Sequence, residues 1–345
     1  MLPPLKLRRI WPALCLAGLC GLTVPVHAQT MDPYAAGMAA FNAHQYAKAA
    51  PLFAAAEAAN PGNSDALLYE GKSLANVNRF AEAEAVLRQY SSQHPQSSDA
   101  LYMLGFVLNR EDKPKESLNT YTQAARLSTP KSDDLKVVAL NYVMLDDYPD
   151  AIRWMKQAVA FDPQNEQAWY GLGRCYYTQS DFPNAEQAFL RALALDSKDL
   201  KAATNLALTL EMRNRPKDAD QQYKKAIVLA DADPKTDEWP YLDYASFLLD
   251  QARAAEAIPL LRRAVAINPR CAACHGKLGR ALQATGQPKQ AVPELERAVA
   301  LSPKDPKLHY ALGRAYRAAG MTAKAKEELA ATAKLYGTKD STGPK

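Results

Sequence analysis

Small and large apolar residues recur along this chain with a period of 34 residues. Steps of this length from Gly173 reach a small residue each time: Gly37, Gly71, Gly105, Ala139 and Ala207. A second small position and an apolar position four residues later keep the same register, as in Ala185 and Phe189. Residues 234–237 interrupt the period, and three more repeats then satisfy the same three positions. Nine repeats between residues 30 and 339 therefore predict a repeat protein.

Each repeat has the spacing of two α-helices joined by a turn. Apolar residues three and four positions apart share one face of a helix, and nothing in the pattern suggests strands. Proline recurs where a second helix is expected to end: Pro61, Pro95, Pro163, Pro269 and Pro303. Because proline cannot continue a helix, it fixes the turn to the next repeat. We expect an all-α fold in which the small residue of each first helix lets the large residue of the second pack closely.

The most informative stretch is Trp169–Tyr176, which reads W-x-x-L-G-x-x-Y. With the residues that follow it, the stretch 166–199 resembles a complete tetratricopeptide repeat. The resemblance implies a right-handed α-solenoid of about nine helix–turn–helix units, which stack because a single pair cannot bury its apolar face alone. It also implies a non-catalytic binding scaffold whose first helices line a concave groove.

The interruption of the period divides the expected array. Repeats one to six span 30–233, and repeats seven to nine span 238–339. Residues 234–237 are either a joint between two arrays or a longer turn, and the low cost of lengthening a loop favours the turn. The last helix is expected over Thr322–Tyr336. We expect residues 340–345 to form a disordered tail.

The first 28 residues predict export from the cytoplasm. Three basic residues precede an apolar run over 10–26, and a small-residue cleavage site ends at Ala28. This order is typical of a secretory signal peptide, and the alternative is an uncleaved membrane anchor. Cleavage after Ala28 would leave no membrane span and would place the protein in the periplasm or outside the cell.

Charge argues against nucleic acid as the partner. The whole chain has 42 basic and 37 acidic residues and a net charge of +5, and removing the three basic residues of the signal lowers it to +2. No run of lysine or arginine occurs in the repeats. No nucleophile–histidine–acid motif, phosphate loop or metal-ligand spacing is present either. We therefore expect no enzyme activity, no bound metal and no cofactor, while the oligomeric state stays open.

The stretch Cys271-Ala-Ala-Cys274-His275 is the candidate for chemistry. Its C-x-x-C-H pattern is the attachment signature of c-type haem, in which two thiols bond the vinyl groups and the histidine ligates iron. A disulfide between Cys271 and Cys274 is favoured over haem attachment, because residues three apart at a helix start lie close enough for a bridge. Two free thiols are the third possibility. His309 occupies the same repeat position as His275, which favours a packing role for both histidines.

The resemblance also implies which residues line the groove. In related arrays, positions 2, 5, 9, 12 and 13 of each repeat face the concave surface, counted from the first residue of the repeat. The aromatic, methionine and arginine residues there are Tyr34, Met38, Phe41, Tyr102, Phe106, Arg110, Tyr170, Arg174, Tyr177, Arg280, Tyr310, Arg314 and Arg317. Such side chains are common anchors of interfaces, so we expect an extended partner segment, apolar at one end and acidic at the other. The alternative is that about half of the tyrosine and methionine side chains only pack between repeats.

Two function classes remain after these considerations. The first is a scaffold or assembly adaptor in the bacterial cell envelope that binds a protein or an extended peptide. The second is a redox or c-type haem protein that uses Cys271, Cys274 and His275.

Overall fold

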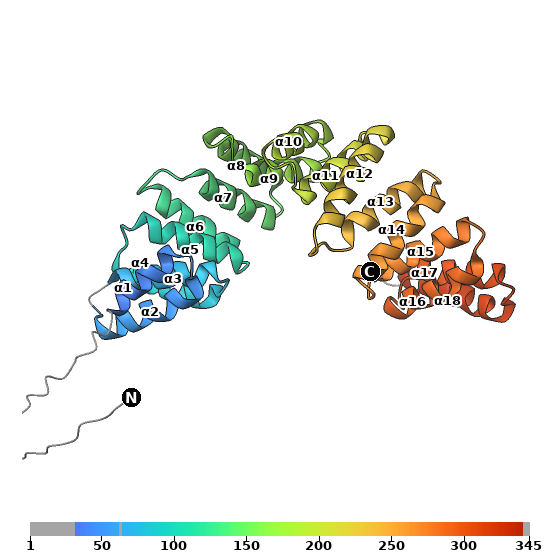
Figure 1. The fold of residues 1–345 in the computed structure, drawn as a ribbon, viewed down its shortest axis with the longest axis horizontal. Coiled ribbons are helices and arrows are strands. Elements are labelled where there is room, and N and C mark those ends of the chain that lie inside the picture. Colours follow the sequence, from blue (N-terminus) through green and yellow to red (C-terminus); the bar gives the residue numbers. More distant parts are fainter. Residues whose placement is uncertain (1–31, 62–63, 341–345) are drawn as a thin grey trace, which may run out of the picture. The chain divides into compact units, whose positions relative to one another are not determined.

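The computed structural model describes residues 32–61 and 64–340. The expected signal peptide (1–28) lies outside the described residues, as do residues 341–345 of the expected tail. The described part of the chain contains eighteen helices and no strand (Figure 1), which confirms the all-α fold. The helices are α1 (Pro33–Asn42), α2 (Tyr46–Ala59), α3 (Ser64–Asn76), α4 (Phe80–Gln93), α5 (Ser98–Arg110), α6 (Pro114–Ala125), α7 (Ser132–Met144), α8 (Tyr148–Phe161), α9 (Glu166–Thr178), α10 (Phe182–Leu195), α11 (Leu200–Met212), α12 (Pro216–Ala232), α13 (Trp239–Asp250), α14 (Ala254–Ile267), α15 (Ala272–Ala284), α16 (Pro288–Leu301), α17 (Pro306–Ala318) and α18 (Thr322–Asp340).

The chain divides into two compact units, one that ends at Val77 and one that begins at Asn78. The first contains α1 to α3, and the second contains α4 to α18. In the second unit, each odd-numbered helix from α5 to α17 packs against the even-numbered helix that follows it. Each of these first helices except α17 also contacts the first helix of the next pair. The second helices meet through long side chains, such as the ion pair between Arg88 on α4 and Glu116 on α6. The first helices therefore share one surface, which we call the first-helix face.

The turn inside each helix pair has the same backbone conformation in all nine repeats. One residue per turn has a positive φ between 56° and 82°: His44, Asn78, Asp112, Asp146, Ser180, Asn214, Ala252, Gly286 and Gly320. Asparagine, aspartate and glycine tolerate this left-handed conformation better than other residues, and they hold most of these positions. The spacing is 34 residues except across the interruption at 234–237, so the backbone confirms the register inferred from the apolar residues.

The small position of the first helix allows the close packing expected from the sequence. A Cβ atom added to Gly173 would lie 2.7 Å from the ring of Phe189, and one added to Gly105 would lie 2.7 Å from the ring of Tyr121. Both rings belong to second helices and are buried. A methyl group at either glycine would collide with the ring, so the predicted pairing of small and large residues is confirmed.

Repeat four departs from the common pattern because it buries a polar side chain. Asn141 on α7 is fully buried, and its Nδ2 donates to Ser117 Oγ at 2.7 Å. Its Oδ1 accepts from Asn109 Nδ2 at 2.9 Å. Ser117 Oγ in turn donates to the carbonyl of Gly105 at 2.7 Å. A network with these bonds can replace apolar packing without leaving its buried polar groups unpaired.

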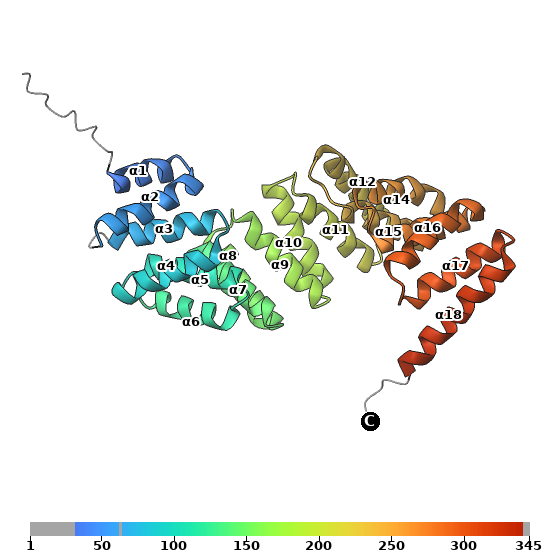
Figure 2. The ribbon, with the colours of Figure 1, turned by 90° about the horizontal axis from the view of Figure 1, so that it is seen from below.

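The two ends of the second array have distinct features. Across the longer turn at 234–237, α13 contacts both α11 and α12, and the hydroxyl of Tyr241 donates to Asp231 at 2.6 Å. At the other end, α18 lies beside α17 (Figure 2) and runs to Asp340, beyond the end expected at Tyr336. A single glycine in a helix costs about 1 kcal/mol, so Gly337 does not end α18. Residue 340 is therefore helical, contrary to the expected tail.

Candidate functional site

The predicted groove residues of the first compact unit pack against their neighbours. Tyr34 lies edge-on to Phe53 with ring centroids 5.8 Å apart, and Phe41 lies 5.1 Å from Tyr69. Met38 packs on the same buried cluster. Tyr34, Met38 and Phe41 are each half-buried. Much of their surface is thus used in packing between helices of this unit.

The predicted residues of α5 divide into two packed rings and one exposed charge. Tyr102 donates from its hydroxyl to the carbonyl of Ser128 at 2.7 Å. Phe106 lies 6.4 Å from the ring of Phe80. Arg110 is exposed, and its guanidinium lies over the Phe80 ring at 5.2 Å. Of the three, Arg110 is the side chain that remains accessible to a partner.

The predicted residues of α9 show the same division. Tyr170 packs on Phe189, with centroids 6.0 Å apart, and Tyr177 packs on Phe182 at 5.5 Å. Arg174 is exposed. Burial raises the pKa of the Tyr170 hydroxyl, and the nearby Arg174 guanidinium lowers it in part. The aromatic rings are held in place here, while Arg174 reaches solvent.

On α15 and α17, all of the predicted groove residues are exposed. Arg280 on α15 and Arg314 and Arg317 on α17 are exposed, and none of the three makes an ion pair in the described part of the chain. Tyr310 on α17 is 49% exposed, and Arg314 lies over its ring at 6.0 Å. These four side chains make up the basic, aromatic end of the predicted groove.

Sequence reasoning missed a group of charged side chains on the same face. Glu211 on α11, Asp243 on α13 and Lys277 on α15 lie near one another. Burial, followed by the Glu211 carboxylate, raises the pKa of Asp243 to about 6. Burial also raises the pKa of Glu211 and lowers that of Lys277. Glu211 occupies position 12 of its repeat, an expected groove position, so its charge was the signal that could have found the group.

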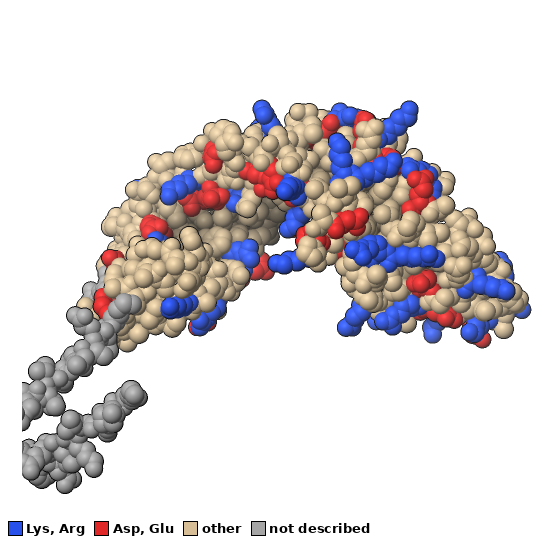
Figure 3. Space-filling model, viewed as in Figure 1, with Lys and Arg blue, Asp and Glu red and all other residues tan. Residues whose placement is uncertain are grey.

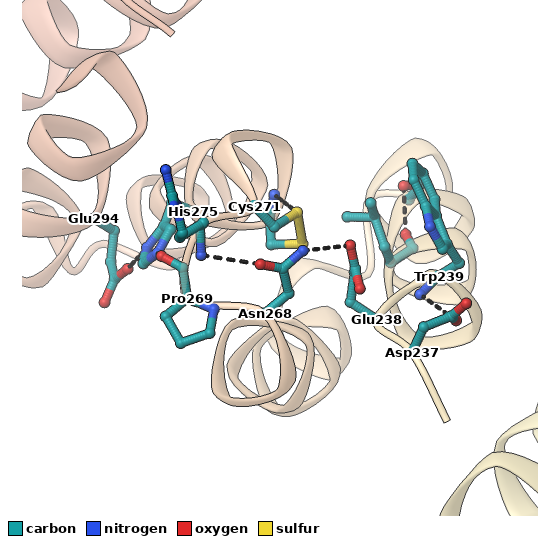
Figure 4. Close-up of a disulfide and its surroundings, with 12 residues drawn as sticks. Asp237, Glu238, Trp239, Asn268, Pro269, Cys271, His275 and Glu294 are labelled. Atoms are coloured by element: carbon teal, nitrogen blue, oxygen red, sulfur yellow. Dashed lines mark hydrogen bonds and ion pairs between the residues drawn. A yellow bond between two sulfur atoms is a disulfide. The ribbon is translucent and has the colours of Figure 1, made fainter. Parts of the chain in front are cut away.

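The cysteine motif lies where α15 begins (Figure 4). Cys271 and Cys274 form a disulfide with an S–S distance of 2.07 Å. Cys271 is also the N-cap residue of α15, and its Sγ accepts from the backbone N–H of Cys274 at 3.1 Å. Cys274 is fully buried and Cys271 is half-buried. The pairing is the one that the sequence analysis favoured over haem.

His275 faces protein acceptors on both sides. Its Nδ1 lies 2.6 Å from a carboxylate oxygen of Glu294, and its Nε2 lies 3.2 Å from the carbonyl oxygen of Pro269 (Figure 4). A haem attached here would need both cysteine sulfurs for thioether bonds and a ring nitrogen of His275 for iron. Because the sulfurs are joined and both ring nitrogens are engaged, these residues as arranged do not fit a haem. The haem hypothesis gains no support.

The contact between His275 and the preceding proline recurs in other repeats. His309 Nε2 lies 3.0 Å from the carbonyl oxygen of Pro303, and Trp169 Nε1 donates to the carbonyl of Pro163 at 3.0 Å. All three rings occupy position 4 of their repeats. Tryptophan and histidine can share this position because each brings a ring nitrogen to the same backbone carbonyl.

Models of the tetratricopeptide repeat match most of these helix pairs. One model matches residues 139–200 and 179–235, and another matches residues 40–105, 248–292 and 282–338. Together the matches cover more than half of the chain. This chain belongs to the tetratricopeptide repeat family. The close pairing of Gly173 with Phe189 is thus a contact inside one tetratricopeptide repeat, and the proline contacts link one such repeat to the next.

Solved structures share the fold of this tetratricopeptide repeat protein. The structure of the APC/C hetero-tetramer Cut9–Hcn1 matches with a TM-score of 0.56 and 14% identity, over 78% of this chain and 52% of that chain. The chain therefore spans about half of that relative. A tetratricopeptide repeat protein from Parabacteroides merdae matches with a TM-score of 0.54 and 19% identity, over 73% and 98% of the two chains. PilF from Pseudomonas aeruginosa matches with a TM-score of 0.53 and 17% identity, over 61% and 94%. No match is found among curated proteins.

Two further properties concern the described ranges 32–61 and 64–340. No helix in them is both long enough and apolar enough to cross a membrane. Within the same ranges, His, Cys, Asp and Glu side chains do not gather in threes as metal ligands would.

Proposed function

We propose that this tetratricopeptide repeat protein is a non-catalytic scaffold or assembly adaptor of the bacterial cell envelope. It binds an extended protein segment along the first-helix face. The observation that carries the proposal is the exposure of arginine side chains on this face: Arg174, Arg280, Arg314 and Arg317. Arginine is a common anchor of interfaces because its planar group forms paired hydrogen bonds at small entropic cost.

Two arginines outside this set already form ion pairs within the protein. Arg88 forms ion pairs with Glu84 and Glu116, at 2.7 and 2.6 Å. Arg253 forms ion pairs with Asp220 and Glu256, both at 2.6 Å. Those arginines already have their acceptors inside the protein. Within the described residues, the four exposed arginines of the first-helix face form no such ion pair and remain available to a partner.

The envelope location rests on residues 1–28, which carry the order of a secretory signal peptide. We expect the exported protein to begin at Gln29. Intact mass measured on protein isolated from the source cells tests this expectation. Retention of Met1 would remove the support for a signal that is cleaved.

Site-specific photo-crosslinking tests the binding face. A photoreactive residue placed at Arg174 or Arg314 should crosslink to the same partner protein in source cells. The matched controls are Lys156 on α8 and Gln187 on α10, which are exposed on second helices. These positions should give little of that product. Equal crosslinking from both sets, or crosslinking from second helices alone, contradicts the proposed face.

A further inference from the structure

Three uncompensated arginines lie close together on α15 and α17. Arg280 and Arg314 occupy position 9 of adjacent repeats, and packed helices are about 10 Å apart. Gln283 on α15 donates from its Nε2 to the carbonyl of Ala311 on α17 at 2.8 Å, which joins the two helices one turn away from each arginine. Arg317 follows one turn later on α17. We call Arg280, Arg314 and Arg317, with the exposed Tyr310, the basic strip.

Space for a bound side chain adjoins the basic strip. A hollow of about 540 Å³ lies beside Arg280, where the turn between α13 and α14 meets the end of α15. Ala254, Thr285 and the paired Arg253 are among the residues that line it. A side chain that neighbours an acidic residue of a bound segment can occupy this hollow.

Negative charge borders the strip on one side. Lys277 lies one turn before Arg280 on α15, and three carboxylates lie near it: Asp250, Asp243 and Glu211. Burial and then the Arg280 charge lower the pKa of Lys277, and these carboxylates offset that shift in part. These carboxylates come from α11 and α13 and offset the charge of Lys277. Within the described residues, none of them forms an ion pair with an arginine of the basic strip. Figure 3 shows acidic side chains next to basic ones over the region of α13 to α15.

The border selects among anionic partners. A uniformly charged polyanion, such as nucleic acid, would meet the carboxylates of α13 and α11 as it continued along the face, and like charges repel. A peptide can change its sequence at that point. An extended chain advances about 3.3 Å per residue, so two adjacent helices correspond to about three residues of peptide.

We propose that the basic strip binds a short run of acidic residues within the partner's extended segment, and that the carboxylates of α11 and α13 set where that run ends. The proposal rests on the proposed scaffold function and specifies the chemistry of the bound segment. Carboxylate side chains of the segment accept hydrogen bonds from the guanidinium groups. The ring of Tyr310 packs against the aliphatic part of the bound side chains.

The test uses fluorescent peptides in which three glutamates are flanked by glycine–serine stretches. Matched probes carry three glutamines or three lysines instead. Fluorescence anisotropy at neutral pH and low salt should show binding of the glutamate probe, and added salt should weaken it. The double variant Arg280→Glu/Arg314→Glu should weaken binding at least about tenfold, since hydrogen bonds to charged groups are worth about 1.5–3 kcal/mol each.

Two further variants make the test specific. Arg126→Glu/Arg297→Glu changes net charge equally at exposed positions beside the second helices and should bind the glutamate probe as the wild type does. Asp243→Asn/Asp250→Asn should bind it a few-fold more tightly, because the bordering repulsion is reduced. Circular dichroism should show unchanged helicity in all three variants, since the reversed arginines are exposed and asparagine keeps the shape of the half-buried Asp243 and the exposed Asp250.

Two binding results would overturn the inference, and so would a failure of the glutamate probe to bind. One is glutamate-probe binding that survives the Arg280/Arg314 reversal. The other is a single-stranded oligonucleotide that binds more tightly than the glutamate probe and equally well with or without the α13 carboxylates. If crosslinking from Arg174 persists while no glutamate probe binds, the scaffold function stands and the basic strip fails. If the probe still binds but crosslinking from the first helices is lost, the basic strip binds acidic residues and the proposed scaffold function fails.

Discussion

The turn before α15 and the turn before α17 make the same contact with the preceding proline, but different residues cap the helix that follows. In both, a histidine at position 4 lies against the carbonyl of the preceding proline and 2.6 Å from a glutamate of the following second helix. The caps differ. Cys271 caps α15 through its sulfur, whereas Asp305 caps α17 by accepting from the backbone N–H of Lys307 at 2.8 Å.

The disulfide is the second difference between the two turns. Cys274 bonds to Cys271, but the residue at the equivalent position of repeat nine is Leu308, which packs toward Gly276. The histidine, proline and glutamate contacts form without a disulfide in repeat nine. These contacts therefore hold the turn in repeat nine by themselves, and the disulfide is an addition to them in repeat eight.

Replacing each of the two histidines should have the largest effect on stability. The two losses should show which turn contributes more to the free energy of unfolding. His275 is 7% exposed and lies inside the stack, so His275→Ala leaves Glu294 and the Pro269 carbonyl without their partner. We expect a loss of about 2–3 kcal/mol in the free energy of unfolding. His309→Ala, in the last repeat, should lose about half as much. Urea unfolding followed by circular dichroism measures both, and equal losses would break the ranking.

Exchanging the cysteines for the residues of repeat nine tests whether the disulfide is an addition. A disulfide that closes four residues should contribute about 2 kcal/mol, so Cys271→Ala/Cys274→Ala should lose roughly that amount. Cys271→Asp/Cys274→Leu should recover about half of the loss, because an aspartate N-cap is worth about 1 kcal/mol. Thermal unfolding under oxidising and reducing conditions compares the variants with the parent protein. A Cys271→Asp/Cys274→Leu chain that fails to fold would show that the disulfide is required.

Gly276 offers a smaller test of how the two repeats meet. A Cβ atom at this position would lie 2.7 Å from Cδ2 of Leu308. Gly276→Ala should cost about 1 kcal/mol, because the leucine side chain can move but must leave its packing. Leu308→Ala made together with Gly276→Ala should remove most of the cost of the added methyl group. A double-mutant cycle measures this non-additivity as a coupling energy. Additive effects of the two changes would indicate that the contact does not constrain the interface.

The smallest expected effect is a pH dependence at repeat nine. Burial lowers the pKa of His309, but its contacts with the Pro303 carbonyl and with Glu328 raise it by more, so the net pKa lies above its ordinary value of 6.5. The resulting stabilisation is fully present below pH 6.5 and is lost as pH rises through the folded-state pKa. Unfolding measured from weakly acidic to weakly alkaline pH should show this decline, and His309→Gln should flatten it. A decline of equal slope in the variant would assign it to another group.

Predictions from the sequence were reliable where one residue type at one spacing sets a contact. The pairing of Gly173 with Phe189 followed from size alone, and so did the number of repeats. Exposure was harder to predict. Tyr102 and Tyr310 share position 5 of their repeats, yet Tyr102 bonds to the Ser128 carbonyl and Tyr310 is about half exposed. The surroundings of each ring, and not its position in the period, decide this.

Polar contacts between repeats could not be predicted from the sequence for a related reason. Asn109 and Asn141 are 32 residues apart, so the 34-residue period does not pair them. Stacking of the repeats brings their side chains together as a hydrogen-bonded pair. The group of Glu211, Asp243 and Lys277 is of the same kind, since its members come from three first helices.

The sequence by itself determined the all-α repeat fold, its register and the family. These properties depend on the sizes of residues at fixed spacing, and a period repeated nine times carries that information redundantly. The tertiary structure alone decided which arginines remain without carboxylates, which tyrosines are used in packing and where acidic side chains border the basic strip. Charge pairing and burial depend on side chains from neighbouring helices, and those neighbours are defined only once the repeats have stacked.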